Sequence, residues 1–283
     1  MNYRHAFHAG NFADVLKHVV LALLVEDLKR KPAAFFYLDT HAGRGCYDLS
    51  ESQAQRSGEY KSGIGRLLEL PAAGIPEELD TYLGLVKQSA GPGRSPITAY
   101  PGSPMIVAML RRDQDRMALY ESQPAEAQVL RDRLRGQRRL SIVEADGYAG
   151  LKAQLPPKEK RGLVLIDPPY ESEREFDALL EGLRLAHARW PTGIYCIWYP
   201  RTGRSAPGRF LNAVQASGIR RVLNVTLDVL PEGSPLGMGG AGLVIVNPPW
   251  QLDLRLEKLL PQLHALLSLR GAGGWDLRWL VPE

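Results

Sequence analysis

The sequence predicts an α/β fold in which a mostly parallel sheet carries helices on both faces. The first observation is alternation, since short apolar runs from residue 100 onward are separated by amphipathic segments of helical length. The second is that the last two apolar runs, 221–229 and 243–246, have no helical segment between them. They predict an antiparallel hairpin at one edge. Seven strands are expected in all.

The composition is that of an ordinary globular protein. The 283 residues are 45% hydrophobic and 23% charged, with a formal net charge of +4, which excludes disordered and fibrous classes. No apolar stretch approaches the roughly 18 residues that cross a bilayer, and the first residues lack the apolar core of a signal peptide. Cys46 and Cys196 are too few for a disulfide framework or a four-ligand metal site. We therefore expect a soluble, cytoplasmic, monomeric protein without a bound metal.

The first helix is predicted over residues 11–31. Asn11 is a candidate N-cap, with Asp14 three residues further on. Apolar residues then recur at helical spacing as one stripe, and Pro32 ends the helix. A short buried strand follows at 35–39 and leads into a glycine-containing loop.

The segment from 46 to 98 has a different texture. Glycine and proline residues break it into short amphipathic pieces, such as 79–86. We expect residues 46–98 to form a small helical insertion, and residues 1–45 and 99–283 to form one domain around it.

Alternation resumes after the insertion. Helices are predicted at 104–112, 124–135, 147–154, 174–187 and 207–217. The strands that follow them are predicted at 116–120, 141–144, 162–166, 194–198 and 221–229, with the last strand at 243–246.

Acidic residues stand at the carboxyl ends of four predicted strands: Asp39, Glu121, Asp146 and Asp167. In an open α/β sheet, ligands bind beyond these ends. Acids suit a cationic, hydroxyl-rich ligand, and S-adenosylmethionine fits, with its sulfonium and amino groups, a ribose diol for Glu121 and an adenine amine for Asp146. Gly43 would let the backbone of the first loop approach such a ligand closely. The alternative is that each acid only caps the helix that follows it.

The string Asp167-Pro168-Pro169-Tyr170 follows an apolar strand and points to a reaction. Because two prolines hold a rigid turn, the Asp167 carboxylate and the Pro168 carbonyl present two acceptors to one point. Two such acceptors match an exocyclic amine, whose nitrogen lone pair is then free for in-line attack on a methyl sulfonium. Tyr170 offers a ring on which a target base would stack after leaving its own stack. A plain structural turn is the alternative.

A second string of the same shape, Asn247-Pro248-Pro249-Trp250, also follows an apolar strand. It stands after all the strand-end acids and close to the last residue. The copy at Asp167 comes directly after Asp146, in the order expected beside a cofactor pocket. We therefore assign the chemistry to Asp167 and a structural turn to Asn247.

Arginine carries much of the basic charge, often in pairs such as Arg111-Arg112, Arg138-Arg139 and Arg220-Arg221. Because arginine grips phosphate through two parallel hydrogen bonds, a nucleic-acid partner would explain the pattern. A GC-rich genome that encodes surface cations as arginine explains it equally well, so charge alone does not decide.

The N-terminal string at 3–18, which reads YRHAFHAGNFADVLKH, resembles the bacterial 23S ribosomal RNA adenine-N6 methyltransferases of the RlmJ type. So do LDTHAG at 38–43, YPGSP at 100–104, DG at 146–147, DPPYE at 167–171 and VNPPW at 246–250. The resemblance covers essentially the whole chain. The N-terminal string is far more specific than DPPY, which many amino-methyltransferases share.

The resemblance implies a Rossmann-like methyltransferase fold with a small helical insertion, S-adenosylmethionine as cofactor, and 23S rRNA free of ribosomal proteins as substrate. It implies that Asp167 is catalytic within its motif with Pro168, Pro169 and Tyr170, and that Tyr3, with Arg4 beside it, contacts the RNA. Arg44 and Cys46 depart from the family pattern beside the motif glycines. Taken with the strand-end acids, the expected cofactor contacts are Lys17, His18, Asp39, His41, Gly43, Ser103, Glu121, Asp146, Gly147 and Asp167.

Three other hypotheses stay open. A DNA adenine methyltransferase would share the motif and the cofactor, but it usually carries a target-recognition domain, for which 46–98 is short. A protein-glutamine methyltransferase typically has Asn at the first motif position, as only the copy at 247–250 does. A non-catalytic RNA-binding protein that kept the fold would have no need of the strand-end acids, and cofactor titration separates it from an enzyme.

Overall fold

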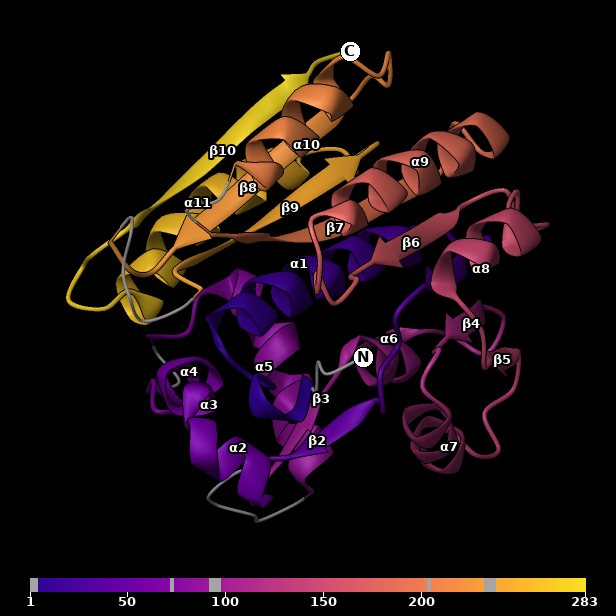
Figure 1. The fold of residues 1–283 in the computed structure, drawn as a ribbon. Coiled ribbons are helices and arrows are strands. Elements are labelled where there is room, and N and C mark those ends of the chain that lie inside the picture. Colours follow the sequence, from indigo (N-terminus) through magenta and orange to yellow (C-terminus); the bar gives the residue numbers. More distant parts are fainter. Residues whose placement is uncertain (1–4, 72–73, 92–97, 203–204, 232–237) are drawn as a thin grey trace.

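The computed structural model describes residues 5–71, 74–91, 98–202, 205–231 and 238–283. Within them an eight-stranded sheet runs through the centre, in the order β10-β8-β9-β7-β6-β1-β4-β5 (Figure 1). Its strands are β1 Phe36–Asp39, β4 Arg116–Tyr120, β5 Leu140–Val143, β6 Gly162–Ile166, β7 Ile194–Arg201, β8 Val222–Asp228, β9 Gly240–Val246 and β10 Gly274–Val281. The pairs from β5 through β4, β1 and β6 to β7 are parallel. In contrast, β9 is antiparallel to both β7 and β8, and β10 is antiparallel to β8.

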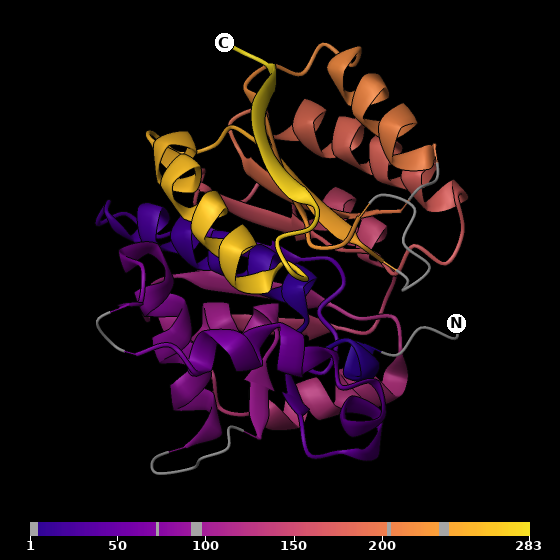
Figure 2. The same cartoon turned by 90° about the vertical axis from the view of Figure 1, so that its left-hand side faces the viewer.

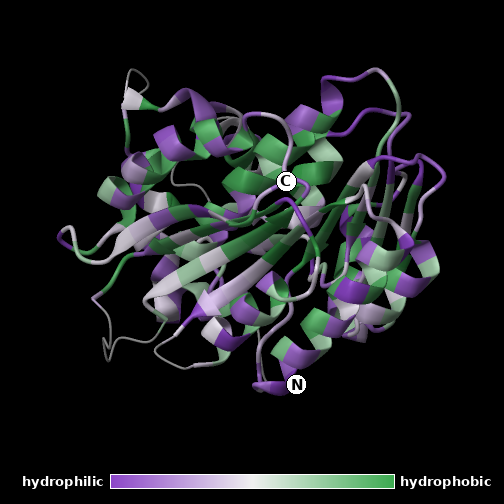
Figure 3. Cartoon of the chain, turned by 90° about the horizontal axis from the view of Figure 1, so that it is seen from above, coloured by the Kyte–Doolittle hydropathy of each residue, from purple (hydrophilic) through white to green (hydrophobic). Residues whose placement is uncertain are grey.

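Helices cover both faces of the sheet. One face carries α1 Phe12–Lys29, α6 Ser103–Leu110, α7 Pro124–Arg133 and α11 Leu252–Leu267; the other carries α8 Gly147–Gln154, α9 Arg174–Arg189 and α10 Ala206–Gln215. Neighbouring strand residues divide between the two cores, so that Tyr37 joins the first and Leu38 the second. Figure 2 shows α10 and α11 on opposite sides of β10, and Figure 3 shows the hydrophobic colour concentrated on the strands.

Helix α1 is more deeply buried than a single apolar stripe predicts. Asn11 caps it as expected, since its side chain accepts hydrogen bonds from the amides of Ala13 and Asp14, both at 3.0 Å. Nevertheless, every residue from 13 to 25 is buried, because α5 (Glu77–Ala90), α6 and α11 cover the sides that the sheet does not reach. None of the helices in the described ranges, α1 included, is long and apolar enough to cross a membrane.

The segment 46–98 begins on a two-stranded ladder that the sequence did not predict. In it, β2 Cys46–Asp48 pairs antiparallel with β3 Ala99–Pro101. Between these strands stand α2 Ser52–Ser57, α3 Glu59–Ser62, α4 Ile64–Leu68 and α5. Leu83 of α5 belongs to the same core as α1, so the segment packs directly against the sheet domain. Its description as a separate subdomain stays a prediction.

The predicted antiparallel pairing of the last two apolar runs is confirmed as β8 with β9, but the count of seven strands and the place of this hairpin at the edge were wrong. The described residues hold an eighth strand, β10, outside β8, and β9 lies between β7 and β8 rather than at the margin. Strand β10 mixes charged residues with tryptophan and leucine, and no residue in it is buried. Because no continuous apolar run marks such an edge strand, periodicity did not reveal it.

Candidate active site

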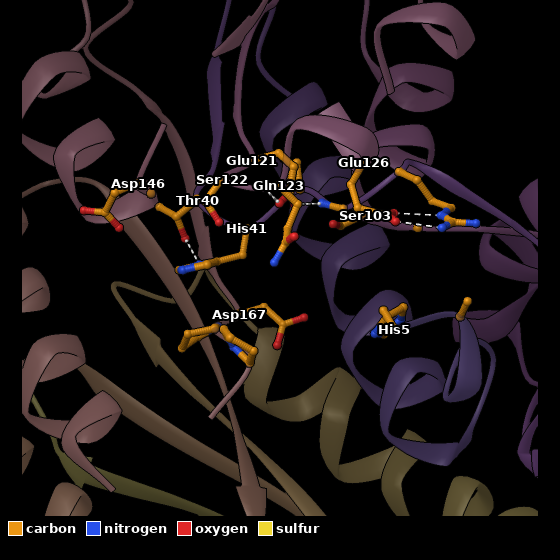
Figure 4. A pocket seen from close by; sticks show the side chains of 18 of the residues that line it. His5, Thr40, His41, Ser103, Glu121, Ser122, Gln123, Glu126, Asp146 and Asp167 are labelled. Carbon is orange, nitrogen blue, oxygen red and sulfur yellow. Dashed lines mark hydrogen bonds and ion pairs between the residues drawn. The ribbon is translucent and has the colours of Figure 1, made fainter. Parts of the chain in front are cut away.

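A cavity of about 670 Å³ opens at the carboxyl ends of four neighbouring strands, β1, β4, β5 and β6 (Figure 4). The segments that follow these strands supply most of its lining: 40–44, 121–126, 146–148 and 167–169. Helix α1 adds Lys17 and His18, and the start of α6 adds Ser103. The cavity therefore lies where the strand order predicted a ligand site.

Of the four strand-end acids, Asp39 does not line this cavity. It is fully buried as the last residue of β1, and its carboxylate accepts hydrogen bonds from the hydroxyls of Tyr37 at 2.8 Å and Ser103 at 2.7 Å and from the amide of His41 at 3.2 Å. Burial raises the pKa of Asp39 to about 6. Asp39 therefore positions two lining residues, Ser103 and His41, and its expected contact with the cofactor stays a prediction.

Glu121 and Asp146 do line the cavity, and each also has a structural task. The Glu121 carboxylate accepts hydrogen bonds from the amides of Gly43 and Gln123, both at 2.8 Å, and burial raises its pKa. The Asp146 carboxylate caps α8 by accepting from the amides of Tyr148 at 3.3 Å and Ala149 at 3.2 Å. Asp146 therefore caps the helix that follows it, as the alternative interpretation held, and it also lines the cavity.

Two glycines let the backbone pass close to the site. Gly43 has φ +62°, and a Cβ there would lie 2.4 Å from the hydroxyl of Tyr47. A Cβ at Gly147 would lie 1.9 Å from the carbonyl oxygen of Thr40, so the start of α8 touches the loop after β1. Only glycine allows these approaches.

Lys17 links two carboxylates from different parts of the chain. It is 5% exposed, and its Nζ lies 2.9 Å from Asp14 Oδ1 and 2.5 Å from Asp167 Oδ2. Burial alone would lower the pKa of Lys17, but the two carboxylates raise it well above its usual range. Burial alone would likewise raise the pKa of Asp14, but electrostatic interactions with its neighbours, His5 and Lys17 among them, hold that pKa well below its usual range.

Both histidines expected at the cofactor line the cavity and are neutral at pH 7. Burial lowers the pKa of His18 to about 3 and that of His41 to about 4. His18 Nδ1 lies 2.7 Å from the hydroxyl of Tyr100, and His41 Nδ1 lies 2.8 Å from Thr40 Oγ1. These contacts fix both rings without a charge.

The motif that begins at Asp167 separates this cavity from a second one of about 570 Å³. Asp167, Pro168 and Pro169 line both. Tyr170 lines only the second, where its hydroxyl donates to the carbonyl oxygen of Trp198 at 2.5 Å and the two ring centroids lie 5.6 Å apart. The remaining lining of the second cavity divides between apolar side chains, such as Phe12 and Leu230, and polar or charged ones, such as His8, Glu59 and Arg66.

The second Pro-Pro string lies beside the amino ends of the parallel strands, whereas the cavity lies at their carboxyl ends. Because β9 is antiparallel to β7, its last residue, Val246, pairs with Tyr195 near the start of β7. The Asn247 side chain donates to the carbonyl oxygens of Pro191 and Gly193, both at 2.8 Å. Asn247 is therefore a structural turn, and strand direction distinguishes the two copies.

Several lining residues were missed from the sequence. His5 lines both cavities, with its Nε2 2.9 Å from Asp14 Oδ2. Arg44 and Glu126 form a two-pronged ion pair at the margin, with both N–O distances 2.7 Å. Figure 4 shows Gln123 on the side of the cavity that faces Asp167. His5 lies within the string that carries the family resemblance, whereas the Arg44–Glu126 pair joins residues 82 positions apart and has no local signal.

Tyr3 and Arg4, expected at the RNA, lie outside the described residues. Cys46 and Cys196 are both buried and free. In the described part of the chain, no three His, Cys, Asp or Glu side chains are grouped so as to hold a metal ion.

Comparisons with known proteins agree on one kind of protein. A family model described as "Ribosomal RNA large subunit methyltransferase D, RlmJ" matches residues 32–281. The protein named "Ribosomal RNA large subunit methyltransferase J" from Escherichia coli (strain K12) is 43% identical over 283 residues, which cover 100% of both chains. The protein of the same name from Haemophilus influenzae is 42% identical over the same span. A crystal structure of a Legionella pneumophila protein is similar with a TM-score of 0.85 and 34% identity, covering 96% of this chain and 97% of the other.

Proposed function

This chain belongs to the RlmJ family of ribosomal RNA large subunit methyltransferases, and on that basis we propose that it transfers a methyl group from S-adenosylmethionine to the exocyclic N6 amine of an adenine in 23S rRNA. The observation that carries the proposal is the position of Asp167 between the two cavities. One cavity suits the cofactor and the other suits the target base. A group placed at their junction can act on the reacting nitrogen.

The first cavity fits S-adenosylmethionine in size and in chemistry. Its volume of about 670 Å³ is within the usual range for a ligand of this size. The buried Glu121 carboxylate, whose two oxygens each accept one amide hydrogen bond, keeps lone pairs for a ribose diol. Neutral His18 and His41 add no positive charge to the site. When bound, the cofactor supplies a methyl group on a positively charged sulfur.

The second cavity suits an adenine that has left its stack. Tyr170 and Trp198 offer aromatic rings beside the motif on which a base could stack, and apolar side chains such as Phe12 and Leu230 line part of the same cavity. Because the Tyr170 hydroxyl is held by the Trp198 carbonyl, the tyrosine ring is fixed before the base enters. A fixed platform lowers the entropy cost of binding.

The Asp167 carboxylate and the Pro168 carbonyl oxygen would each accept a hydrogen bond from the N6 amine. Lys17 would orient the Asp167 carboxylate, since its Nζ lies 2.5 Å from Asp167 Oδ2, and it is held in turn by Asp14. With both hydrogens engaged, the nitrogen lone pair would face the first cavity. Its attack on the methyl carbon would break the carbon–sulfur bond and leave a neutral thioether, and the nitrogen would then lose one proton to solvent. The reaction requires no covalent enzyme intermediate, which agrees with the burial of both cysteines.

The test is to replace Asp167 and to compare the variant with a matched change at the other copy. We expect Asp167→Ala to abolish transfer of labelled methyl groups to an unmodified 23S rRNA transcript while the variant stays folded. Asn247→Ala should keep transfer within about threefold of the wild type. Transfer by Asp167→Ala together with loss in Asn247→Ala would refute the assignment of the site.

Four further expectations belong to the same proposal. Tyr3 and Arg4 contact the RNA, the RNA is free of ribosomal proteins, the enzyme works as a monomer, and residues 46–98 act as a separate subdomain. The first is tested by Tyr3→Ala, which should weaken the use of RNA more than it weakens cofactor binding. An unchanged apparent affinity for RNA would remove Tyr3 from the substrate site.

A further inference from the structure

Four loops lie at the amino ends of the parallel strands, on the side of the sheet opposite the two cavities. Residues 30–35, 111–115, 134–139 and 155–161 lead into β1, β4, β5 and β6. These strands are adjacent and parallel, so the loops meet at one edge. A strand of five residues is about 16 Å long, and this length separates the loops from the cavities.

These four loops, called the basic edge below, carry a larger net positive charge than the whole chain. The loops contain ten Lys or Arg residues and three Asp or Glu residues, a net charge of +7. The whole chain has a net charge of +4, so everything outside the basic edge carries a net charge of −3.

Three arginines link the loops through hydrogen bonds to backbone carbonyl oxygens. Arg112 and Arg161 both donate to the carbonyl oxygen of Ala33, at 3.0 and 2.6 Å, and Arg111 donates to the carbonyl oxygen of Arg138 at 2.8 Å. Their guanidinium groups are committed to structure, so this part of the arginine pattern has a structural cause. The result is a cross-linked surface that needs little ordering on binding.

The acidic residues in the loops leave other cations uncompensated. Asp115 is fully buried and is paired with Arg112, and Glu159 lies 3.0 Å from Arg116. The third acidic residue, Asp113, is exposed and interacts electrostatically with Arg111. Arg138, Arg139 and Lys158 are exposed, and none of them forms an ion pair with any residue that the structure describes.

We propose that the basic edge binds the phosphate backbone of RNA at a site remote from the target adenine. The inference rests on the proposed function, because the substrate is then a long RNA that extends far beyond one base. Lysine and arginine on a fixed surface neutralise phosphates without reading sequence. The cavities select the base, and the basic edge supplies the charge that holds the rest of the RNA.

The test compares two triple variants of equal charge. In the first, Arg138, Arg139 and Lys158 are changed to Gln; in the control, Lys87 of α5, Arg184 of α9 and Lys258 of α11, all exposed, are changed to Gln. Both variants lower the net charge equally. Binding of an unmodified 23S rRNA transcript is measured from 50 to 300 mM KCl, together with kcat and KM for methyl transfer.

For the first variant we expect the slope of log K against log [KCl] to fall by about 2, since each lost phosphate contact removes about 0.7–0.9. KM for the transcript should rise several-fold at 100 mM KCl with kcat unchanged. The control should keep the wild-type slope and KM. Equal slopes and equal KM values in the two variants would overturn the basic edge, whereas absence of transfer by the wild type would overturn the proposed function.

Discussion

Lys17 carries its charge where a charge is costly, and its two partners make that possible. Its side chain is 6% exposed, and it joins Asp14 on the same helix to Asp167 at the end of β6. Removing one partner of a buried ion pair leaves the other charge without compensation. The same lysine therefore contributes both to stability and to the position of the proposed catalytic carboxylate.

Replacing Lys17 tests this double role. We expect Lys17→Met to lower the free energy of unfolding by about 3 kcal/mol, because Asp14 stays buried after losing its ion pair with Lys17. Urea denaturation measures the change. The double variant Asp14→Asn with Lys17→Met should recover part of the loss. A single variant as stable as the wild type would contradict the account.

His18 predicts a dependence of stability on pH. Its pKa is about 3 in the folded protein and near 6.5 in the unfolded chain. Between these values the unfolded state binds one more proton, so stability falls as the pH falls below about 6.5. The contribution is about 1.4 kcal/mol per pH unit.

The variant His18→Asn separates the contribution of His18 from that of the other titrating groups. The difference in unfolding free energy between wild type and His18→Asn should shrink by about 2 kcal/mol between pH 7 and pH 5. Other titrating groups, including Asp39, are common to both proteins and cancel. Urea titrations at the two pH values give the result, and a difference independent of pH would show that His18 is not held neutral.

At the scale of elements, the position of α8 against the loop after β1 depends on one missing side chain. A Cβ at Gly147 would lie 1.9 Å from the backbone oxygen of Thr40. By contrast, a Cβ at Gly84, on the exposed side of α5, would meet nothing within 4 Å. The two glycines are a matched pair for a stability test.

We expect Gly147→Ala to destabilise the protein by about 2–3 kcal/mol, because the loop or the helix must move apart. Gly84→Ala should stabilise it by about 0.5–1 kcal/mol, since alanine loses less backbone entropy in a helix. Thermal unfolding of both variants measures the two signs. Equal effects would show that the contact between α8 and Thr40 is not tight.

Most helices and strands could be predicted because their apolar residues recur at a clear helical or strand spacing. Strands 116–120 and 162–166 and helix 147–154 are confirmed to the residue. The elements that were missed have a weak period: β10 is a half-exposed edge strand, and the β2–β3 ladder joins residues about 50 positions apart. Pairing across that distance leaves no local pattern.

The candidate site was predictable to the extent that strand ends converge. Glu121, Asp146 and Asp167 line the cavity because each follows its strand. Asp39 does not, because it is still inside β1, where its side chain points the same way as that of Tyr37 and into the core. One residue along a strand decides between a lining group and a supporting one.

At the scale of the whole molecule, strand direction organises function. The parallel strands gather both cavities at one edge and the basic edge at the other. The reversed direction of β9 removes Asn247 from the site, although its local sequence resembles that of Asp167. Direction could not be read from the Asn247 string alone, since it depends on which strand β9 pairs with.

The most direct test of the central claim is to identify the methylated nucleoside. Unmodified 23S rRNA transcript is incubated with the enzyme and labelled S-adenosylmethionine, digested to nucleosides and separated by chromatography. The account predicts that the label appears in N6-methyladenosine and is absent with Asp167→Ala. Label in any other nucleoside, or a transcript left unlabelled by an enzyme that binds the cofactor, would contradict it.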